Sequence, residues 1–110
     1  MTRHKITTNF YLDEFVYPQI HASYGSNAMW FVDRRIVEAM QYLRTKSGKP
    51  IHINNWVKGG SLDMRGLRPF ASLIGSKMSQ HKFGRATDSN IEGLTTEEYF
   101  EFVMSHEKYL

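Results

Sequence analysis

Two side chains in the segment 79–88 have the types and the spacing of a metal site. His81 offers an imidazole nitrogen and Asp88 a carboxylate, and zinc accepts both donors in proteins. Gly84 lies between them and permits a sharp turn, while Ala86, on the same face of an extended strand as Asp88, leaves room for an ion. Together with Ser79 they form the pattern S-x-H-x-x-G-x-A-x-D. The two residue types alone favour an ordinary surface pair, whereas the accompanying serine, glycine and alanine favour the metal site.

The sequence limits which side chains can hold a metal. It contains no cysteine and five histidines, so disulfides and thiolate sites are excluded. Any zinc ion must therefore be bound by His, Asp or Glu.

The segment 79–88 resembles the zinc motif of the D-Ala-D-Ala carboxypeptidase family, whose members have a Hedgehog-type fold. That family includes phage endolysins that cleave L-alanyl-D-glutamate or related links. Weaker likeness lies in the aromatic opening at 9–15, the long central helix, and the short segments 48–51 (GKPI) and 93–98 (GLTTEE). The likeness covers most of the chain and is strongest toward the branch of carboxypeptidase-like C-terminal domains.

The resemblance implies a zinc ion held by His81, Asp88 and a further histidine, with water in the fourth position. Zinc in that setting acidifies its water and polarises the scissile carbonyl. In the family, the third ligand and a catalytic glutamate lie beyond the helix that follows the aspartate, so we expect the general base beyond Leu110. His106 is the histidine downstream of Asp88 and is the candidate third ligand within this sequence; a helix-surface histidine is the alternative.

The resemblance also implies side chains that bind the substrate. Ser79 is expected near the metal. Where the family has an aromatic-arginine pair, this sequence has Trp56 and, two positions later, Lys58. The ammonium of Lys58 would supply a point charge but could not form the two parallel hydrogen bonds of an arginine. Arg65 and Arg68 in the next loop would suit the carboxylate of a stem peptide. For each basic side chain, a solvated loop charge is the alternative.

Two helices are expected in the first half of the chain. The aromatic opening predicts a short helix through Phe15 that ends near Pro18. From Asn27, apolar residues recur at steps of three and four, which predicts a long amphipathic helix. Gly48 follows that pattern and predicts a left-handed cap, with Pro50 just beyond it.

Two strands are expected on either side of a long loop. Residues 51–56 alternate, with His52 and Asn54 on the face opposite the isoleucines. Residues 57–80 are rich in glycine and basic side chains, and a loop of that length in a small domain is usually functional or disordered. Residues 85–91 alternate again and predict the second strand.

A final helix completes the predicted fold. Thr95 and Glu98 form a capping box ahead of apolar residues at helical spacing. The resemblance implies an α+β fold, a small antiparallel sheet with helices packed on one side, Hedgehog/DD-peptidase-like, and the expected helices and strands agree with that class. Residues 1–110 would form a single zinc-peptidase-like domain that lacks its C-terminal strand.

Composition bounds the class of protein. A length of 110 residues with 41% hydrophobic and 14% aromatic residues suits one domain with a modest core. The net charge of +3 produces only a weak electrostatic field, and the sequence contains no motif that reads a nucleic-acid groove. Nucleic acid is therefore not expected as a partner. No run reaches signal-peptide length or the ~20 apolar residues of a membrane span. We expect a protein made in the host cytoplasm without a signal peptide, and no membrane partner.

The resemblance implies a zinc-dependent peptidase that cleaves peptidoglycan stem peptides, of endolysin or DD-carboxypeptidase type, and we expect it to be encoded by a phage and to act at the bacterial cell wall or on the virion. The alternative is a catalytically incomplete homologue that serves as a virion or tail component, or as a cell-wall-binding module, with other phage virion proteins as partners. A small nucleic-acid-binding domain, with Trp30 and Trp56 as stacking surfaces, is a weaker hypothesis.

Overall fold

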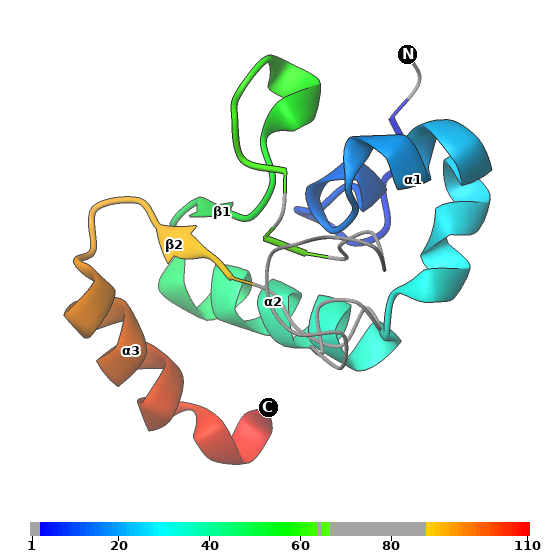
Figure 1. Ribbon diagram of the computed structural model, residues 1–110. Helices are drawn as coiled ribbons and strands as arrows, with labels where there is room; N and C mark the ends of the chain where they lie inside the picture. Colours follow the sequence, from blue (N-terminus) through cyan, green and yellow to red (C-terminus); the bar gives the residue numbers. More distant parts are fainter. Residues whose placement is uncertain (1–2, 64, 67–87) are drawn as a thin grey trace, which may run out of the picture.

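The computed structural model describes residues 3–63, 65–66 and 88–110, and within them the chain is a small α+β domain. Figure 1 shows the strand pair beside the C-terminal end of α2, with α1 toward the other end of the domain and α3 leading away from β2. The predicted α+β class is confirmed for this part of the chain. Its α-helices and strands are α1 (Pro18–Tyr24), α2 (Arg34–Ser47), β1 (Ile51–His52), β2 (Asn90–Ile91) and α3 (Thr96–Ser105). Short 3-10 helices are η1 (Leu12–Glu14), η2 (Gly25–Phe31), η3 (Trp56–Lys58) and η5 (Glu107–Tyr109).

The long helix α2 ends as expected but begins later than expected. Gly48 adopts φ 64° in the left-handed region, and its N–H donates to the Arg44 carbonyl. The predicted start at Asn27 is wrong, because residues 25–31 form the 3-10 helix η2 instead. Asp33 caps α2, since its carboxylate accepts a 2.9 Å hydrogen bond from the Arg35 N–H. The cap overrides an apolar periodicity that runs through both segments.

The short N-terminal helix predicted through Phe15 is confirmed only as a single 3-10 turn. The only helical turn there is η1, in which Glu14 accepts a 2.8 Å hydrogen bond from the Tyr11 N–H. Pro18 begins α1 rather than following the end of a helix. A proline fits the first helical position because the N–H that it lacks would have no partner within the helix.

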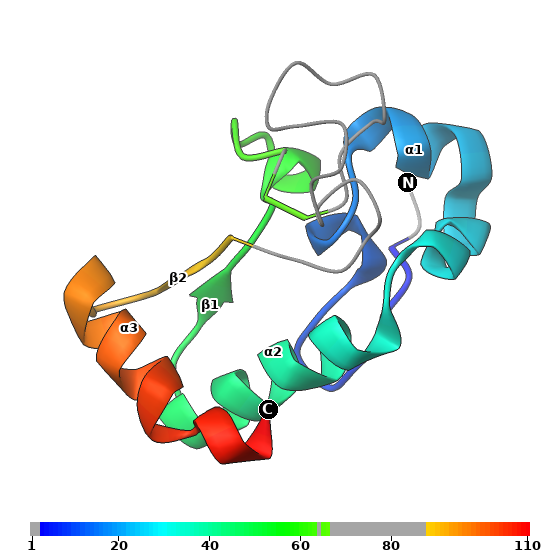
Figure 2. The ribbon, with the colours of Figure 1, turned by 60° about the horizontal axis from the view of Figure 1, so that its bottom comes forward.

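The core joins the N-terminal segment to α2 and the strand pair. Figure 2 shows the N-terminal segment running along α2. Burial of each large apolar side chain stabilises the fold by about 1.5–3 kcal/mol, so this contact is the main source of stability. The buried core residues are Phe10, Leu12, Phe15, Val16, Ala28, Val32, Val37, Met40, Leu43, Ile51, Ile53 and Ile91.

The strand pair is antiparallel and shorter than predicted. Ile51 lies opposite Ile91, and His52 opposite Asn90. The expected alternation of residues 51–56 fails at Asn54, which is 4% exposed although His52 is exposed. Asn54 can be buried because its amide has hydrogen-bond partners inside the fold.

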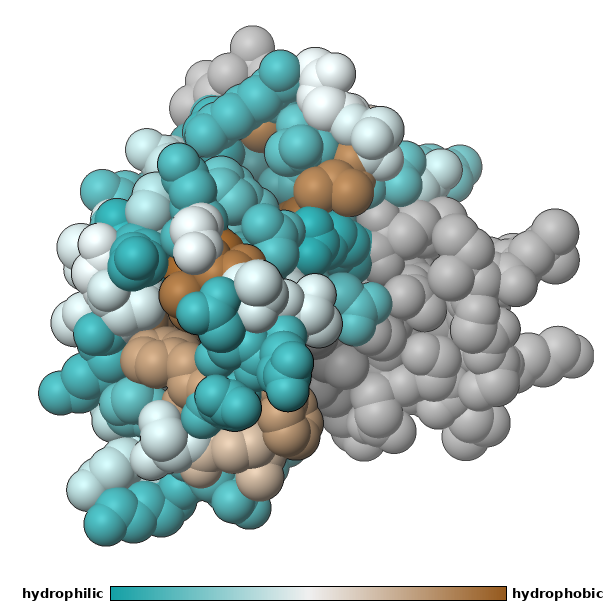
Figure 3. Space-filling model, turned by 90° about the vertical axis from the view of Figure 1, so that its left-hand side faces the viewer, coloured by the Kyte–Doolittle hydropathy of each residue, from teal (hydrophilic) through white to brown (hydrophobic). Residues whose placement is uncertain are grey.

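Helix α3 begins with the predicted capping box. The Thr95 hydroxyl accepts from the Glu98 N–H at 3.1 Å, and the Glu98 carboxylate accepts from the Thr95 N–H at 2.9 Å. One face of α3 packs on the core, whereas Phe100 and Met104 are exposed. Figure 3, which views the left-hand side of Figure 1, shows brown and tan apolar surface among teal polar groups. No helix in the described ranges is long and apolar enough to cross a membrane.

Candidate functional site

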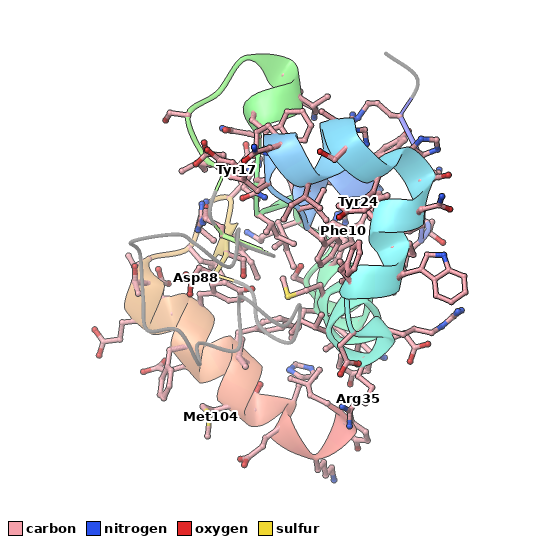
Figure 4. All side chains as sticks on the ribbon, turned by 45° about the vertical axis from the view of Figure 1, so that its right-hand side comes forward. Phe10, Tyr17, Tyr24, Arg35, Asp88 and Met104 are labelled. Carbon is pink, nitrogen blue, oxygen red and sulfur yellow. The ribbon has the colours of Figure 1, made fainter. Side chains whose placement is uncertain are left out.

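Two of the predicted site residues, Arg65 and Asp88, lie next to each other in space. The Asp88 N–H donates a 2.7 Å hydrogen bond to the Arg65 carbonyl, which joins the two ends of the segment between them. Asp88 lies two residues before the start of β2 and is exposed. Figure 4 shows Asp88 beside β2 and the start of α3. The fold therefore brings a candidate metal ligand and a candidate substrate-binding cation to one place.

Asn54 fixes the position of Arg65. Its side-chain Oδ1 accepts from the Arg65 N–H at 2.9 Å, and its Nδ2 donates to the Val16 carbonyl at 3.0 Å. Its own N–H donates to the Glu14 carbonyl at 3.1 Å. One buried amide thus links three segments around the candidate site. The sequence assigned Asn54 only to a strand face, and its one signal was an amide at the end of an apolar alternation.

The guanidinium of Arg65 is oriented by β2. Its Nη1 donates a 2.8 Å hydrogen bond to the Asn90 Oδ1. Arginine carries five N–H donors in a planar fork, so one bond to an amide leaves several for an anion. Arg65 as a whole is half-buried, and its hydrogen bond to Asn90 is exposed, so the fork is accessible from solvent.

A groove begins beside Asp88 and runs between α2 and α3. Its volume is about 860 Å³, and the described residues that line it include Asp88 and Ser89. Apolar side chains from both helices, among them Ile36, Met40 and Val103, line it as well. Asp33 and Arg35 at the start of α2 add charged groups to the lining. A groove that is mostly apolar with a few polar groups is typical of ligand sites.

Tyr99 adds a hydroxyl to the groove next to Asp88 and Ser89. Its oxygen lies 2.6 Å from the Ser89 Oγ. Burial raises the pKa of Tyr99 above its usual value, although the hydrogen bond between Tyr99 and Ser89 and the charge of Arg65 act in the opposite direction. Tyr99 therefore stays a neutral hydrogen-bond donor at neutral pH. The sequence gives no sign of this role, because nothing in helical spacing distinguishes a site tyrosine from a core one.

Lys58, another predicted substrate-binding residue, lies in η3 and is exposed. Its charge acts on the half-buried carboxyl of Glu14. Burial raises the pKa of Glu14 above its ordinary value, and the Tyr11 N–H and the charges of Arg3 and Lys58 offset part of that rise. Perturbed carboxyls are enriched at functional sites, so Glu14 joins the candidate residues that the sequence did not indicate.

His106 lies away from Asp88. Its ring packs against Phe102 and Tyr42, with centroids 4.6 and 5.7 Å apart, and its Nδ1 lies 3.0 Å from the Phe102 carbonyl. Tyr99, next to Ser89, marks the near end of α3, and His106 follows the far end, about 10 Å further along the helix axis. The fold thus gives His106 a role in packing the end of α3 against α2.

His21 is a buried imidazole that the sequence did not single out. It is 6% exposed, and within the described part of the chain its Nε2 has no hydrogen-bond partner. Its ring lies between those of His4 and Trp56, at centroid distances of 5.9 and 5.5 Å. These contacts define an aromatic cluster at the base of α1, on elements other than those that carry Asp88.

A complete metal-binding set is not found in the described part of the chain. Within residues 3–63, 65–66 and 88–110, no group of three or more His, Asp or Glu side chains is arranged to hold an ion. Asp88 is the one predicted zinc ligand there besides His106. His81, Ser79 and Arg68 lie outside the described residues, and so does Ala86. The fit of zinc to this site therefore depends on His81.

Comparison of the chain with protein-family models, with curated proteins and with solved structures gave no match.

Proposed function

We propose that this chain is a zinc-dependent peptidase that cleaves peptidoglycan stem peptides, of endolysin or DD-carboxypeptidase type, with His81 and Asp88 among its zinc ligands. The resemblance of the segment 79–88 to a zinc motif suggests the chemistry. The observation that supports it is the contact between Asp88 and Arg65, because a ligand and a cation for the substrate carboxylate would have to be neighbours.

The remaining groups around Asp88 suit a peptide that ends in, or carries, a carboxylate. The Arg65 fork, held by Asn90, would bind that carboxylate with two parallel hydrogen bonds. The Tyr99 hydroxyl would donate to a peptide carbonyl. The apolar groove beyond would take small apolar side chains such as those of alanine.

Zinc binding and peptide release test this proposal together. The wild-type chain should bind about one zinc ion per molecule and gain thermal stability from it, since a ligand that binds only the folded state stabilises that state. It should release stem-peptide fragments from purified peptidoglycan. His81→Ala and Asp88→Asn should lose both properties.

His52→Ala is the matched control. His52 is exposed, its ring lies 3.4 Å from the carboxylate of Glu92 just after β2, and it is neither a proposed zinc ligand nor a proposed substrate-binding residue. It should bind zinc and release peptide as the wild type does. A folded wild-type chain that binds no zinc, or equal loss in the His52 variant, would refute the proposal.

Arg65 can be tested separately from the metal. Arg65→Ala should raise KM about tenfold or more and leave zinc affinity unchanged, because it removes a charged contact to substrate. Arg65→Lys should recover only part of the loss, since an ammonium lacks the bidentate geometry. Unchanged KM in both variants would exclude Arg65 from substrate binding.

A cell-wall-binding or virion module without catalysis is the second candidate function. The position of His106 favours this function, because its ring packs against Phe102 of α3 and Tyr42 of α2 and lies away from Asp88, so it does not complete the metal site. Sedimentation with purified peptidoglycan in the presence of a chelator distinguishes this function. Binding without zinc content and without peptide release would support it over the peptidase.

A further inference from the structure

Three exposed aromatic side chains lie where α1 passes directly into η2. Trp30 is 86% exposed, and Tyr24 and Phe31 are exposed as well. The rings of Tyr24 and Phe31 contact each other edge to face, with centroids 4.9 Å apart and planes at 65°. We call Tyr24, Trp30 and Phe31 the aromatic elbow. Tyr24 and Phe31 are in contact, and Trp30 precedes Phe31 in η2. Contiguous exposed apolar surface marks interaction sites more often than isolated side chains do.

The backbone beneath the aromatic elbow is held firmly. Ala28 is buried in the core, and Met29 packs against it. The Val32 N–H donates a 3.2 Å hydrogen bond to the Met29 carbonyl at the end of η2. The inward residues of η2 therefore anchor the segment while its outward residues face solvent. A rigid aromatic surface binds with a smaller loss of conformational entropy than a mobile one.

The charged side chains that follow the elbow are paired with one another. Arg35 binds Asp33 at 2.7 Å, and Arg34 binds Glu38 at 3.1 Å. The other exposed side chains of the turn, Ser26 and Asn27, are polar and uncharged. The surface thus offers aromatic faces, hydroxyl and amide groups, and no excess charge among these residues. That combination disfavours nucleic acid and anionic membranes, which both require uncompensated cations.

A neutral glycan has the complementary chemistry. Pyranose rings present C–H faces that pack on aromatic rings, together with hydroxyl and amide groups that pair with polar side chains. We propose that the aromatic elbow binds a neutral chain of N-acetylhexosamines, such as the glycan strand of the bacterial wall. The choice of that polymer rests on the proposed function, whereas the preference for an uncharged sugar rests on the elbow itself.

Tyr24 of the aromatic elbow lies apart from Asp88 of the candidate peptidase site. Figure 4 shows Tyr24 on the α1 side and Asp88 next to β2 and α3. One chain could therefore hold the glycan strand while a stem peptide occupies the groove beside Asp88. Binding at the elbow would raise the local concentration of peptide substrate without altering the chemistry at Asp88.

Oligomers of N-acetylglucosamine test this surface without any peptide or metal. Trp56→Phe leaves Trp30 as the single tryptophan of the chain, so its fluorescence reports on the elbow. Titration with these oligomers in the presence of a chelator should change the Trp30 emission and saturate. Trp30→Ala, followed by calorimetry, should weaken binding at least about tenfold, as truncation of a central aromatic contact does.

Two controls separate a specific loss from a general one. Phe100→Ala removes an exposed aromatic side chain from α3 and should leave the affinity unchanged. Trp30→Ala should melt at the wild-type temperature, because so exposed a side chain contributes little to the core. Raising the salt concentration from about 50 to about 500 mM should change the affinity less than twofold, since no ions are displaced.

Evidence that a partner other than a glycan binds the aromatic elbow would refute the proposal. A Trp30-dependent dimer in analytical ultracentrifugation would assign the elbow to a second copy of this chain. A blue shift of Trp30 with phosphatidylcholine vesicles, without sugar binding, would assign it to a lipid surface. No binding of the oligomers at millimolar concentration would also refute it. All these results are independent of zinc and peptidase activity, so they leave the proposed function untouched.

Discussion

Arg3 and Asp13 form an ion pair at the edge of the core, and its disruption should be costly. Arg3 Nε and Nη2 each lie 2.8 Å from one oxygen of the Asp13 carboxylate, which gives a bidentate pair. The Asp13 side chain is 0% exposed and that of Arg3 is 27% exposed. The guanidinium also lies 4.0 Å from the centroid of the Tyr11 ring. Arg3→Ala would leave a buried carboxylate without its countercharge.

The expected loss for Arg3→Ala is about 3 kcal/mol in the free energy of unfolding. Removing one partner of a buried pair typically costs ~3–5 kcal/mol, and the lower end applies because Arg3 is partly open to water. For a domain of this size, that loss corresponds to a fall of about 12 °C in Tm. Urea unfolding followed by circular dichroism measures it, together with a thermal melt.

Two further variants show whether the geometry or the charge is responsible. Arg3→Lys should lose less than Arg3→Ala, because the charge remains and the bidentate contact does not. The double variant Arg3→Met with Asp13→Leu should recover most of the stability, since apolar replacement of a buried pair is often neutral or better. A loss below about 1 kcal/mol in Arg3→Ala would contradict the account and identify the pair as an ordinary surface one.

Three other predictions concern single positions. Because burial raises the pKa of Glu14, its contribution to stability is fully present below its ordinary pKa and is lost as the pH rises through the raised value. Glu14→Gln keeps an acceptor for the Tyr11 N–H, so denaturation curves from pH 4 to 8 should show its advantage over the wild type growing with pH; a constant difference would contradict the shift. Thr95→Ala should cost about 1 kcal/mol by removing the cap of α3, whereas Thr96→Ala, inside the helix, should be nearly neutral. Gly66→Ala should destabilise by about 1–3 kcal/mol, because an added Cβ would overlap the backbone of Phe15, and normal stability would show that the two segments are not in contact.

Local chemistry made the helix ends most predictable. The end of α2 could be predicted from Gly48 and the proline that follows it, and the start of α3 from Thr95 and Glu98. Both predictions work because a helix cap depends on few neighbouring residues. Periodicity failed where it crossed a cap, since apolar spacing continues through η2 and α2 while Asp33 starts a new helix.

The candidate site was less predictable than the helices. Asp88 and Arg65 could be named from their chemistry, but their contact is a backbone hydrogen bond between distant segments. The buried amide of Asn54 that holds Arg65 breaks the expected alternation, because its partners come from the N-terminal segment. Spacing along one strand carries no information on such partners.

Anomalous scattering at the zinc edge, from crystals of the zinc-loaded chain, tests the proposed metal site most directly. If His81 and Asp88 are zinc ligands, a peak should lie at about 2.0–2.2 Å from both a carboxylate oxygen of Asp88 and a ring nitrogen of His81. A zinc peak elsewhere, for example beside His21, or no ordered zinc next to Asp88, would contradict this prediction.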